Sequence, residues 1–124
     1  MSRNASISLD FGDGEHEFRF AIGQLRELEE KTGVSSFRVL ARMLAYEPMA
    51  DDRREVIRLG LIGGGMKPSE ALHLVRTYCD ERPPAETLPT AVAILQAGLM
   101  GVPDEEPGKS QGETTAPTAP PTTD

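Results

Sequence analysis

Three consecutive glycines at positions 63–65, followed by Pro68, are the feature that most restricts how this chain can fold. Each glycine costs roughly 1 kcal/mol relative to alanine inside a helix, so Gly63, Gly64 and Gly65 together predict a break. Pro68 suits the first turn of a new helix, where its missing N–H is no loss, and Glu70 places a negative charge near that helix's N-terminus. Residues 55–78 are therefore predicted to form two helices joined at a glycine corner.

Apolar residues recur at helical spacing on both sides of this corner. They are Val56, Ile57, Gly60 and Leu61 before the glycines, and Ala71, Leu72, Val75 and Tyr78 after them. We therefore expect a hydrophobic helical corner at the centre of the fold.

Two runs of alternating apolar and polar residues predict a β-hairpin over residues 6–20. Its apolar face consists of Ile7, Leu9, Phe11, His16, Phe18 and Phe20. Residues 12–14, Gly-Asp-Gly, separate the runs, and Asp-Gly supports the positive φ of a tight turn. Because a lone hairpin is marginal in water, its apolar face must pack on helices or its edge must pair with another chain.

Two short helices are expected next. The first covers residues 22–32 and is followed by Gly33, which favours a left-handed C-terminal cap. Ser35 or Ser36 can cap the second helix, which runs through residue 45 before Pro48 closes it. The predicted fold is thus mainly α with an N-terminal β-hairpin (α+β), with four or five short helices around the glycine corner.

The last helix differs from the others. Asp51 and Asp52 begin the third helix, Pro83-Pro84 ends the fourth, and the fifth is expected from about residue 89 to residue 100. Its large apolar side chains cover much of the helix circumference, and they are Val92, Ile94, Leu95, Leu99 and Met100. Such a helix is either buried at the centre or meant for a partner. We expect the exposed subset to bind the partner, helped by the hairpin edge with Ile7, Leu9 and Phe11.

Residues 103–124 are predicted to be a disordered acidic tail rich in proline and threonine. The segment has five acidic residues against one lysine, and two alanines are its only hydrophobic residues. It cannot bury enough apolar surface to offset chain entropy. One small domain over residues 1–102 remains, long enough for a core without disulfide or metal.

Charge and cysteine content restrict the class of protein. The net charge is −7, which argues against binding nucleic acid or an anionic membrane by bulk electrostatics. The single cysteine, Cys79, precludes an internal disulfide and fits a reducing compartment. With no signal-peptide pattern and no apolar run near the ~20 residues of a bilayer span, we expect a cytoplasmic protein.

No catalytic or metal-binding constellation is evident in the sequence. His16 and His73 lack a further ligand at metal-binding spacing, so each is expected to be a surface or packing residue. Cys79 lies on an apolar stripe and is expected to be a small hydrophobe. The glycine run lacks the Gly-Lys-Ser/Thr ending of a phosphate loop. We therefore expect a non-enzymatic protein without cofactor, metal or small-molecule substrate.

DNA binding by a helix-turn-helix is the alternative that the glycine corner raises, since Arg58 and Arg76 lie in its two halves. A recognition helix should present several polar or basic residues from its first two turns. Residues 68–73, Pro-Ser-Glu-Ala-Leu-His, are poor for reading bases. The sequence thus disfavours this alternative.

Residues 57–71, IRLGLIGGGMKPSEA, together with IGQLRELEEKTG at 22–33, carry a resemblance to a known family. Residues 13–102 resemble the small tail assembly chaperones that gene transfer agents (GTAs) of alphaproteobacteria and related siphophages encode next to the tape measure gene. Family members often have a serine before the proline, where this chain has Lys67.

The resemblance implies an assembly factor in the cytoplasm of the bacterial producer cell. Such chaperones bind the tape measure protein while tail-tube subunits polymerise around it, and they are absent from the finished particle. In many phages a ribosomal frameshift adds a longer version. Homo-oligomers are possible for this chain, and the alternative role is a structural tail component that stays in the particle.

Overall fold

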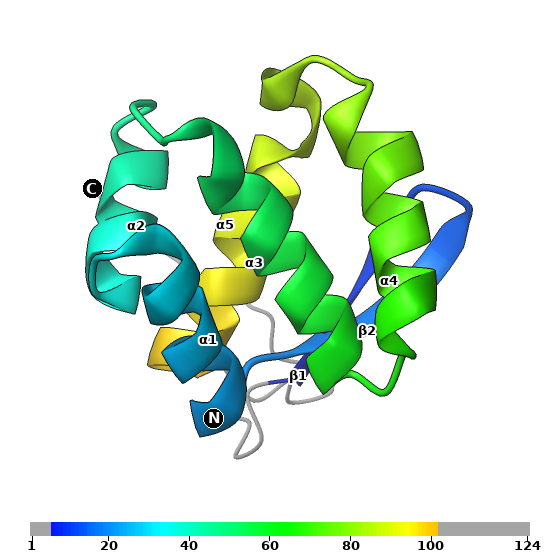
Figure 1. Cartoon of the computed structure of the whole chain (residues 1–124), viewed down its shortest axis with the longest axis horizontal. Helices are drawn as coiled ribbons and strands as arrows, with labels where there is room; N and C mark the ends of the chain where they lie inside the picture. Colours follow the sequence, from blue (N-terminus) through cyan, green and yellow to red (C-terminus); the bar gives the residue numbers. More distant parts are fainter. Residues whose placement is uncertain (1–5, 102–124) are drawn as a thin grey trace, which may run out of the picture.

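The structure, a computed structural model, describes residues 6–101 and orders its elements around a central helix (Figure 1). The elements are the strands β1 (Ser6–Phe11) and β2 (Gly14–Arg19), the helices α1 (Ile22–Thr32), α2 (Ser36–Leu44), α3 (Ala50–Gly63) and α4 (Pro68–Val75), the π-helical turn η1 (Arg76–Asp80), and α5 (Pro84–Met100). The predicted class, mainly α with an N-terminal hairpin, is confirmed. The predicted tail at 103–124 lies outside the described residues.

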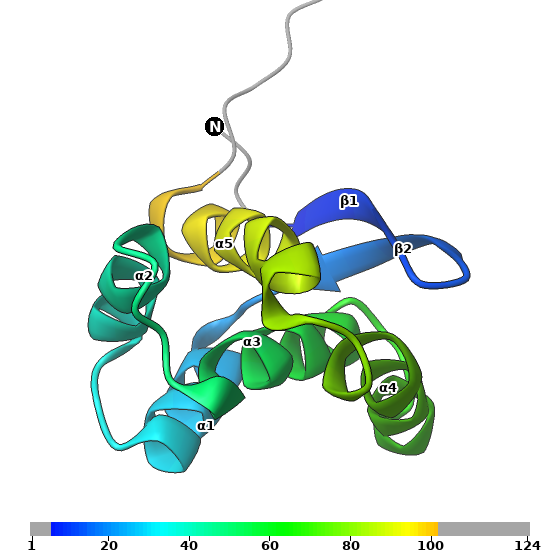
Figure 2. The ribbon, with the colours of Figure 1, turned by 90° about the horizontal axis from the view of Figure 1, so that it is seen from above.

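Helix α3 is the centre of the molecule because it is buried on nearly every side. It packs against α5, β2, α1 and α4, and Figure 2 shows α1 and α4 on either side of it with α5 across it. Its fully buried side chains include Val56, Ile57, Leu59 and Leu61. The corner predicted from the glycines is therefore the core of the fold.

The hairpin packs its apolar face on the helices. β1 and β2 are antiparallel, and Phe11 pairs with Gly14 across the two-residue turn at Gly12 and Asp13. The ring of Phe11 meets the rings of Phe18 and Tyr78 edge to face, with centroids 6.4 and 6.1 Å apart. The hairpin is thus anchored in the core by aromatic contacts to its own second strand and to η1.

The glycines of the corner are required by space as well as by conformation. A Cβ on Gly63 would lie 1.9 Å from the carbonyl oxygen of Arg19, and one on Gly64 would lie 2.0 Å from that of Glu17. Only Gly65 in this run has a positive φ, +113°. The helix continues through Gly63, one residue further than a break at all three glycines predicts, because β2 packs against its last turn.

A buried arginine joins three elements beside the core. Arg53 of α3 donates from Nε to the hydroxyl of Thr87 on α5 at 3.0 Å, and from Nη2 to the carbonyl of Cys79 on η1 at 3.0 Å. Buried polar groups are costly unless hydrogen-bonded, and these bonds satisfy part of the guanidinium. The positions of α5 and η1 relative to α3 are thereby fixed.

Two further helix boundaries differ from those predicted by several residues. α5 begins at Pro84, since Pro84 occupies the first turn where its missing N–H is harmless, and Pro89 lies inside the helix instead of starting it. The fourth helix is not one regular helix up to the prolines, because α4 ends at Val75 and a π-helical turn follows. The end of α5 at Met100 is as predicted.

We predict that Gly63→Ala lowers the free energy of unfolding by about 1–3 kcal/mol, because the new methyl group overlaps the β2 backbone. Gly23→Ala is the matched control, since Gly23 is also helical but a Cβ at that position would have no neighbour within 4 Å. It should raise the free energy of unfolding by up to about 1 kcal/mol through helix propensity alone. Urea denaturation measures both, and equal effects of the two variants would contradict the close approach.

Candidate functional site

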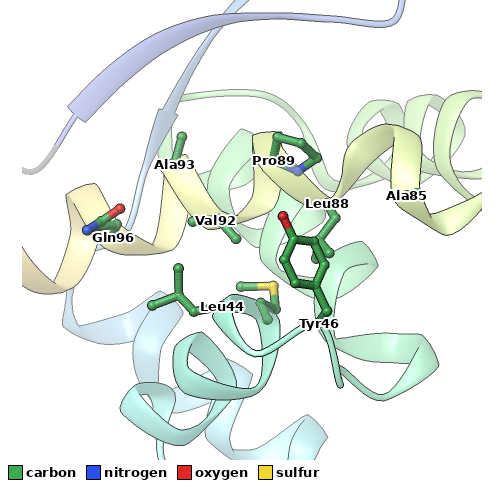
Figure 3. A pocket seen from close by; sticks show the side chains of 9 residues that line it. Leu44, Tyr46, Ala85, Leu88, Pro89, Val92, Ala93 and Gln96 are labelled. Atoms are coloured by element: carbon green, nitrogen blue, oxygen red, sulfur yellow. The ribbon is translucent and has the colours of Figure 1, made fainter.

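An open apolar groove of about 450 Å³ runs between α2 and α5 (Figure 3). Its lining residues are Met43, Leu44, Tyr46, Ala85, Leu88, Pro89, Val92, Ala93 and Gln96. None of these side chains is charged, and Tyr46 and Gln96 supply its polar groups. A cavity of this size with mostly apolar walls is the usual form of a binding site.

The groove exists because two helices meet at their apolar faces and leave a valley above the contact. Met43 and Leu88 are buried and form its floor, while Val92 and Ala93 are half-buried on the α5 side. On α5, Ala85, Leu88, Val92 and Gln96 follow helical spacing, which puts them on one face. The outer face of α5 is thus a groove wall, and its inner face belongs to the core.

Tyr46 rims the groove with an unusual backbone. Its φ is +60°, the left-handed region that favours glycine, and its side chain is 83% exposed. The N–H of Tyr46 bonds to the carbonyl of Met43, and the N–H of Glu47 bonds to that of Arg42. This is a Schellman cap with tyrosine in the place of the usual glycine. A left-handed conformation costs a side-chain-bearing residue about 1–2 kcal/mol, and strain of this kind is concentrated at functional sites.

The apolar surface continues from the groove along α2. Phe37, Ala41 and Leu44 are exposed and lie at i, i+4 and i+7, so they share one face of the helix. Leu44 itself lines the groove. An apolar stripe that extends one wall of a groove marks an interaction surface more specifically than scattered exposed side chains do.

The structure divides the predicted partner-binding residues of α5 into two groups. Ile94 and Leu95 are 1% and 0% exposed and belong to the core, so they are not available at the surface in this conformation. Val92 lines the groove, Leu99 is half-buried, and Met100 is exposed. The expectation that part of this helix reaches the surface therefore points to Val92, Leu99 and Met100.

The predicted residues of the hairpin edge are only partly accessible. Ile7 and Leu9 are half-buried against the core, and Phe11 is buried. Sequence reasoning missed the α2 side of the groove, Leu44 and Tyr46. The exposed i, i+4, i+7 stripe on α2 could have indicated Leu44, whereas nothing in the sequence marks Tyr46.

The candidate chemical residues have ordinary structural surroundings. His16 Nε2 lies 2.7 Å from Asp13 Oδ1, and His16 and His73 line the same surface pocket beside the hairpin turn. Cys79 is fully buried, and this burial raises the pKa of its thiol. Within residues 6–101, no cluster of three or more His, Cys, Asp or Glu side chains could hold a metal ion. None of the helices described is long and apolar enough to span a bilayer.

We predict that Tyr46→Gly is more stable to urea than Tyr46→Ala by about 1 kcal/mol, because both remove the ring but only glycine relieves the left-handed strain. Position 45, where φ is −85°, is the control, and there alanine should be more stable to urea than glycine. There Ala45→Gly should lower the free energy of unfolding, since glycine gains more entropy in the unfolded chain. A Tyr46→Gly variant less stable than Tyr46→Ala would contradict the strain.

Comparison with known proteins supplies the family. No curated protein and no solved structure shows significant similarity to the chain. Residues 4–101, more than half of the chain, match the family described as phage tail tube protein, GTA-gp10. This confirms the expected connection to GTA and phage tails, while the description does not specify a chaperone. The chain belongs to the phage tail tube protein, GTA-gp10 family and has a structural role related to phage or GTA tails.

Proposed function

We propose that this chain is a tail assembly chaperone that holds a helical segment of the tape measure protein in the groove between α2 and α5. The observation that carries the proposal is the uncharged apolar groove with Tyr46 exposed at its rim. Membership of a tail family and the resemblance of residues 57–71 to tail assembly chaperones support the identity of the partner.

The groove suits a helix better than other occupants. Two helices that diverge above a shared floor leave room for a third, which would insert side chains at i, i+3, i+4 and i+7. The rim aromatic, Tyr46, can cover an apolar side chain of the occupant while its hydroxyl stays in water. An amphipathic helix of a tape measure protein, which would aggregate when unaccompanied, has the required chemistry.

The charge of the chain supports a holding role. Residues 6–101 contain 15 acidic and 11 basic residues, a balance of −4, and the full chain has −7. Complexes that share a net charge repel each other, which keeps an apolar cargo dispersed. The same balance disfavours a nucleic-acid partner. Assembly would take place in the cytoplasm of the producer cell, where tail-tube subunits are the second partner we propose.

A non-enzymatic role is part of the proposal. The buried thiol of Cys79 accepts or donates a hydrogen bond with Thr87 at 3.6 Å, and its raised pKa disfavours the nucleophilic thiolate. His16 is engaged by Asp13 at the hairpin turn. These surroundings favour structural roles for the residues that could otherwise do chemistry.

A structural tail component that stays in the particle is the second candidate. The family description, phage tail tube protein, favours it directly. In that case the groove would hold a neighbouring subunit permanently, and the chain would be recovered in fixed proportion with the tube.

The groove is tested by co-expression of the full chain with the tape measure protein of the same gene transfer agent or phage, followed by affinity capture. Leu44→Gln removes an apolar side chain that is 54% exposed, and Ile22→Gln, at 63% exposure outside the groove, is the matched control. Glutamine adds no charge, so helix dipoles do not bias the pair. We predict about tenfold or greater loss of captured tape measure protein for Leu44→Gln, since burial of a leucine stabilises by about 1.5–3 kcal/mol.

Ile22→Gln should capture as much tape measure protein as the parent chain. Tyr46→Gly should lose capture although it relieves backbone strain, which separates binding from stability. If Leu44→Gln and Ile22→Gln capture equally, the groove is not the binding site.

Mass spectrometry of purified particles separates the two candidate functions. The chaperone proposal predicts that this chain is abundant in producer-cell lysates and absent from purified particles. Recovery in a fixed ratio to the tail-tube subunit would establish the retained tail component instead.

A further inference from the structure

The hairpin has one covered edge and one open edge. Because a two-residue turn is flanked by a hydrogen-bonded pair, Phe11–Gly14, the backbone groups of Ile7, Leu9 and Phe11 point toward β2. Those of Ser8 and Asp10 therefore point away from β2, along the outer edge of β1. On β2 the alternation turns Glu17 and Arg19 away from β1, which agrees with the approach of their carbonyls to α3.

The outer edge of β1 has no backbone partner among residues 6–101 at Ser8 and Asp10. Both residues are exposed, and β1 lies at the outside of the fold in Figure 2. Proteins normally cover, shorten or charge such an edge because it is a template for another strand. In this hairpin, the charged side chains beside the edge lie on the outward face of the sheet.

The exposed face beside this edge is acidic. Asp10 lies directly opposite Glu15, and Ser8 lies opposite Glu17, all on the outward side of the hairpin. Arg19, opposite Ser6, is the basic residue on this side, at the end of the hairpin away from Asp10. Within the described part of the chain, no ion pair neutralises Asp10 or Glu15. Like charges directly opposite each other destabilise a strand pair, so the hairpin keeps these carboxylates at a cost. A cation from outside would remove that cost.

We propose that the outer edge of β1 binds an extended segment of another protein in which lysine or arginine alternates with apolar residues. The segment would add a third strand through the N–H and C=O groups of Ser8 and Asp10. Its basic side chains would lie on the acidic face beside Asp10, and its apolar side chains would extend the inner face beside Ile7 and Leu9. This site is separate from the α2–α5 groove and does not rest on the proposed function.

A second copy of the chain is the competing occupant. An antiparallel pairing of two β1 strands centred on Ser8 would place Asp10 of one copy opposite Ser6 of the other. It would bring Asp10, Glu15 and Glu17 of both copies onto one face of a sheet, with Arg19 as the single basic residue that each hairpin adds to that face. A basic strand instead places a cation directly beside the Asp10–Glu15 pair. Charge complementarity therefore favours the basic partner.

The test uses the full chain and a fluorescent peptide of alternating lysine and valine, with binding followed by anisotropy. Ser8→Pro removes the outward N–H and leaves the hairpin ladder intact, because proline is tolerated at strand edges. Ser8→Thr is the matched control and keeps that N–H. A peptide with glutamate in place of lysine tests charge, and a peptide N-methylated at alternate residues tests backbone pairing without changing the protein.

We expect the lysine–valine peptide to bind the parent chain and Ser8→Thr alike, and Ser8→Pro about tenfold or more weakly, because the edge loses its hydrogen bond. The N-methylated and glutamate peptides should not bind. Equal binding to Ser8→Pro and Ser8→Thr, or binding of the N-methylated peptide to the parent chain, would overturn strand addition at this edge. A dimer in solution that Ser8→Pro dissociates would assign the edge to a second copy and also overturn the proposal.

Discussion

The approach of β2 to the C-terminal turn of α3 is the contact on which the rest of the structure depends. Gly63 and Gly64 have no side chains, so the carbonyls of Glu17 and Arg19 come within a distance that a methyl group would forbid. This contact covers one edge of the hairpin and leaves the other outward. The same two glycines lie at the end of α3, where the chain turns back into α4. They therefore determine both the position of the hairpin and the position of the corner.

Much of the fold follows from local chemistry that the sequence displays directly. Gly33 caps α1 in the left-handed region and Ser35 accepts the N–H of Arg38 at the start of α2, both within the predicted positions. The first residue of α5 could not be predicted from the sequence, because a proline can either begin a helix or lie inside one. Pro89 lies inside, since α5 is held by tertiary packing that outweighs the loss of one hydrogen bond.

Only the α5 wall of the candidate site could be predicted from the sequence. Val92 was expected at a partner surface because α5 carries apolar residues around most of its circumference. Whether Ile94 or Val92 faces outward depends on where α3 lies, and helical spacing alone does not determine that. The opposite wall, with Leu44 and Tyr46, requires knowledge that α2 and α5 meet, which is a contact between residues about 50 positions apart. Non-local pairing of this kind leaves no periodic trace in a single sequence.

Pro89 also makes the two ends of the groove between α2 and α5 chemically different. Inside a helix, each N–H bonds to the carbonyl four residues earlier, and proline has no N–H to donate. The carbonyl oxygen of Ala85 therefore lacks its helical donor, and Ala85 and Pro89 both line the groove between α2 and α5. This acceptor lies at the Ala85 end of the α5 wall and the side chain of Gln96 at the other, with the apolar Leu88 and Val92 between them. An occupant that brings a hydroxyl or amide donor to this point would be held in a single orientation and register, which apolar contacts alone do not specify.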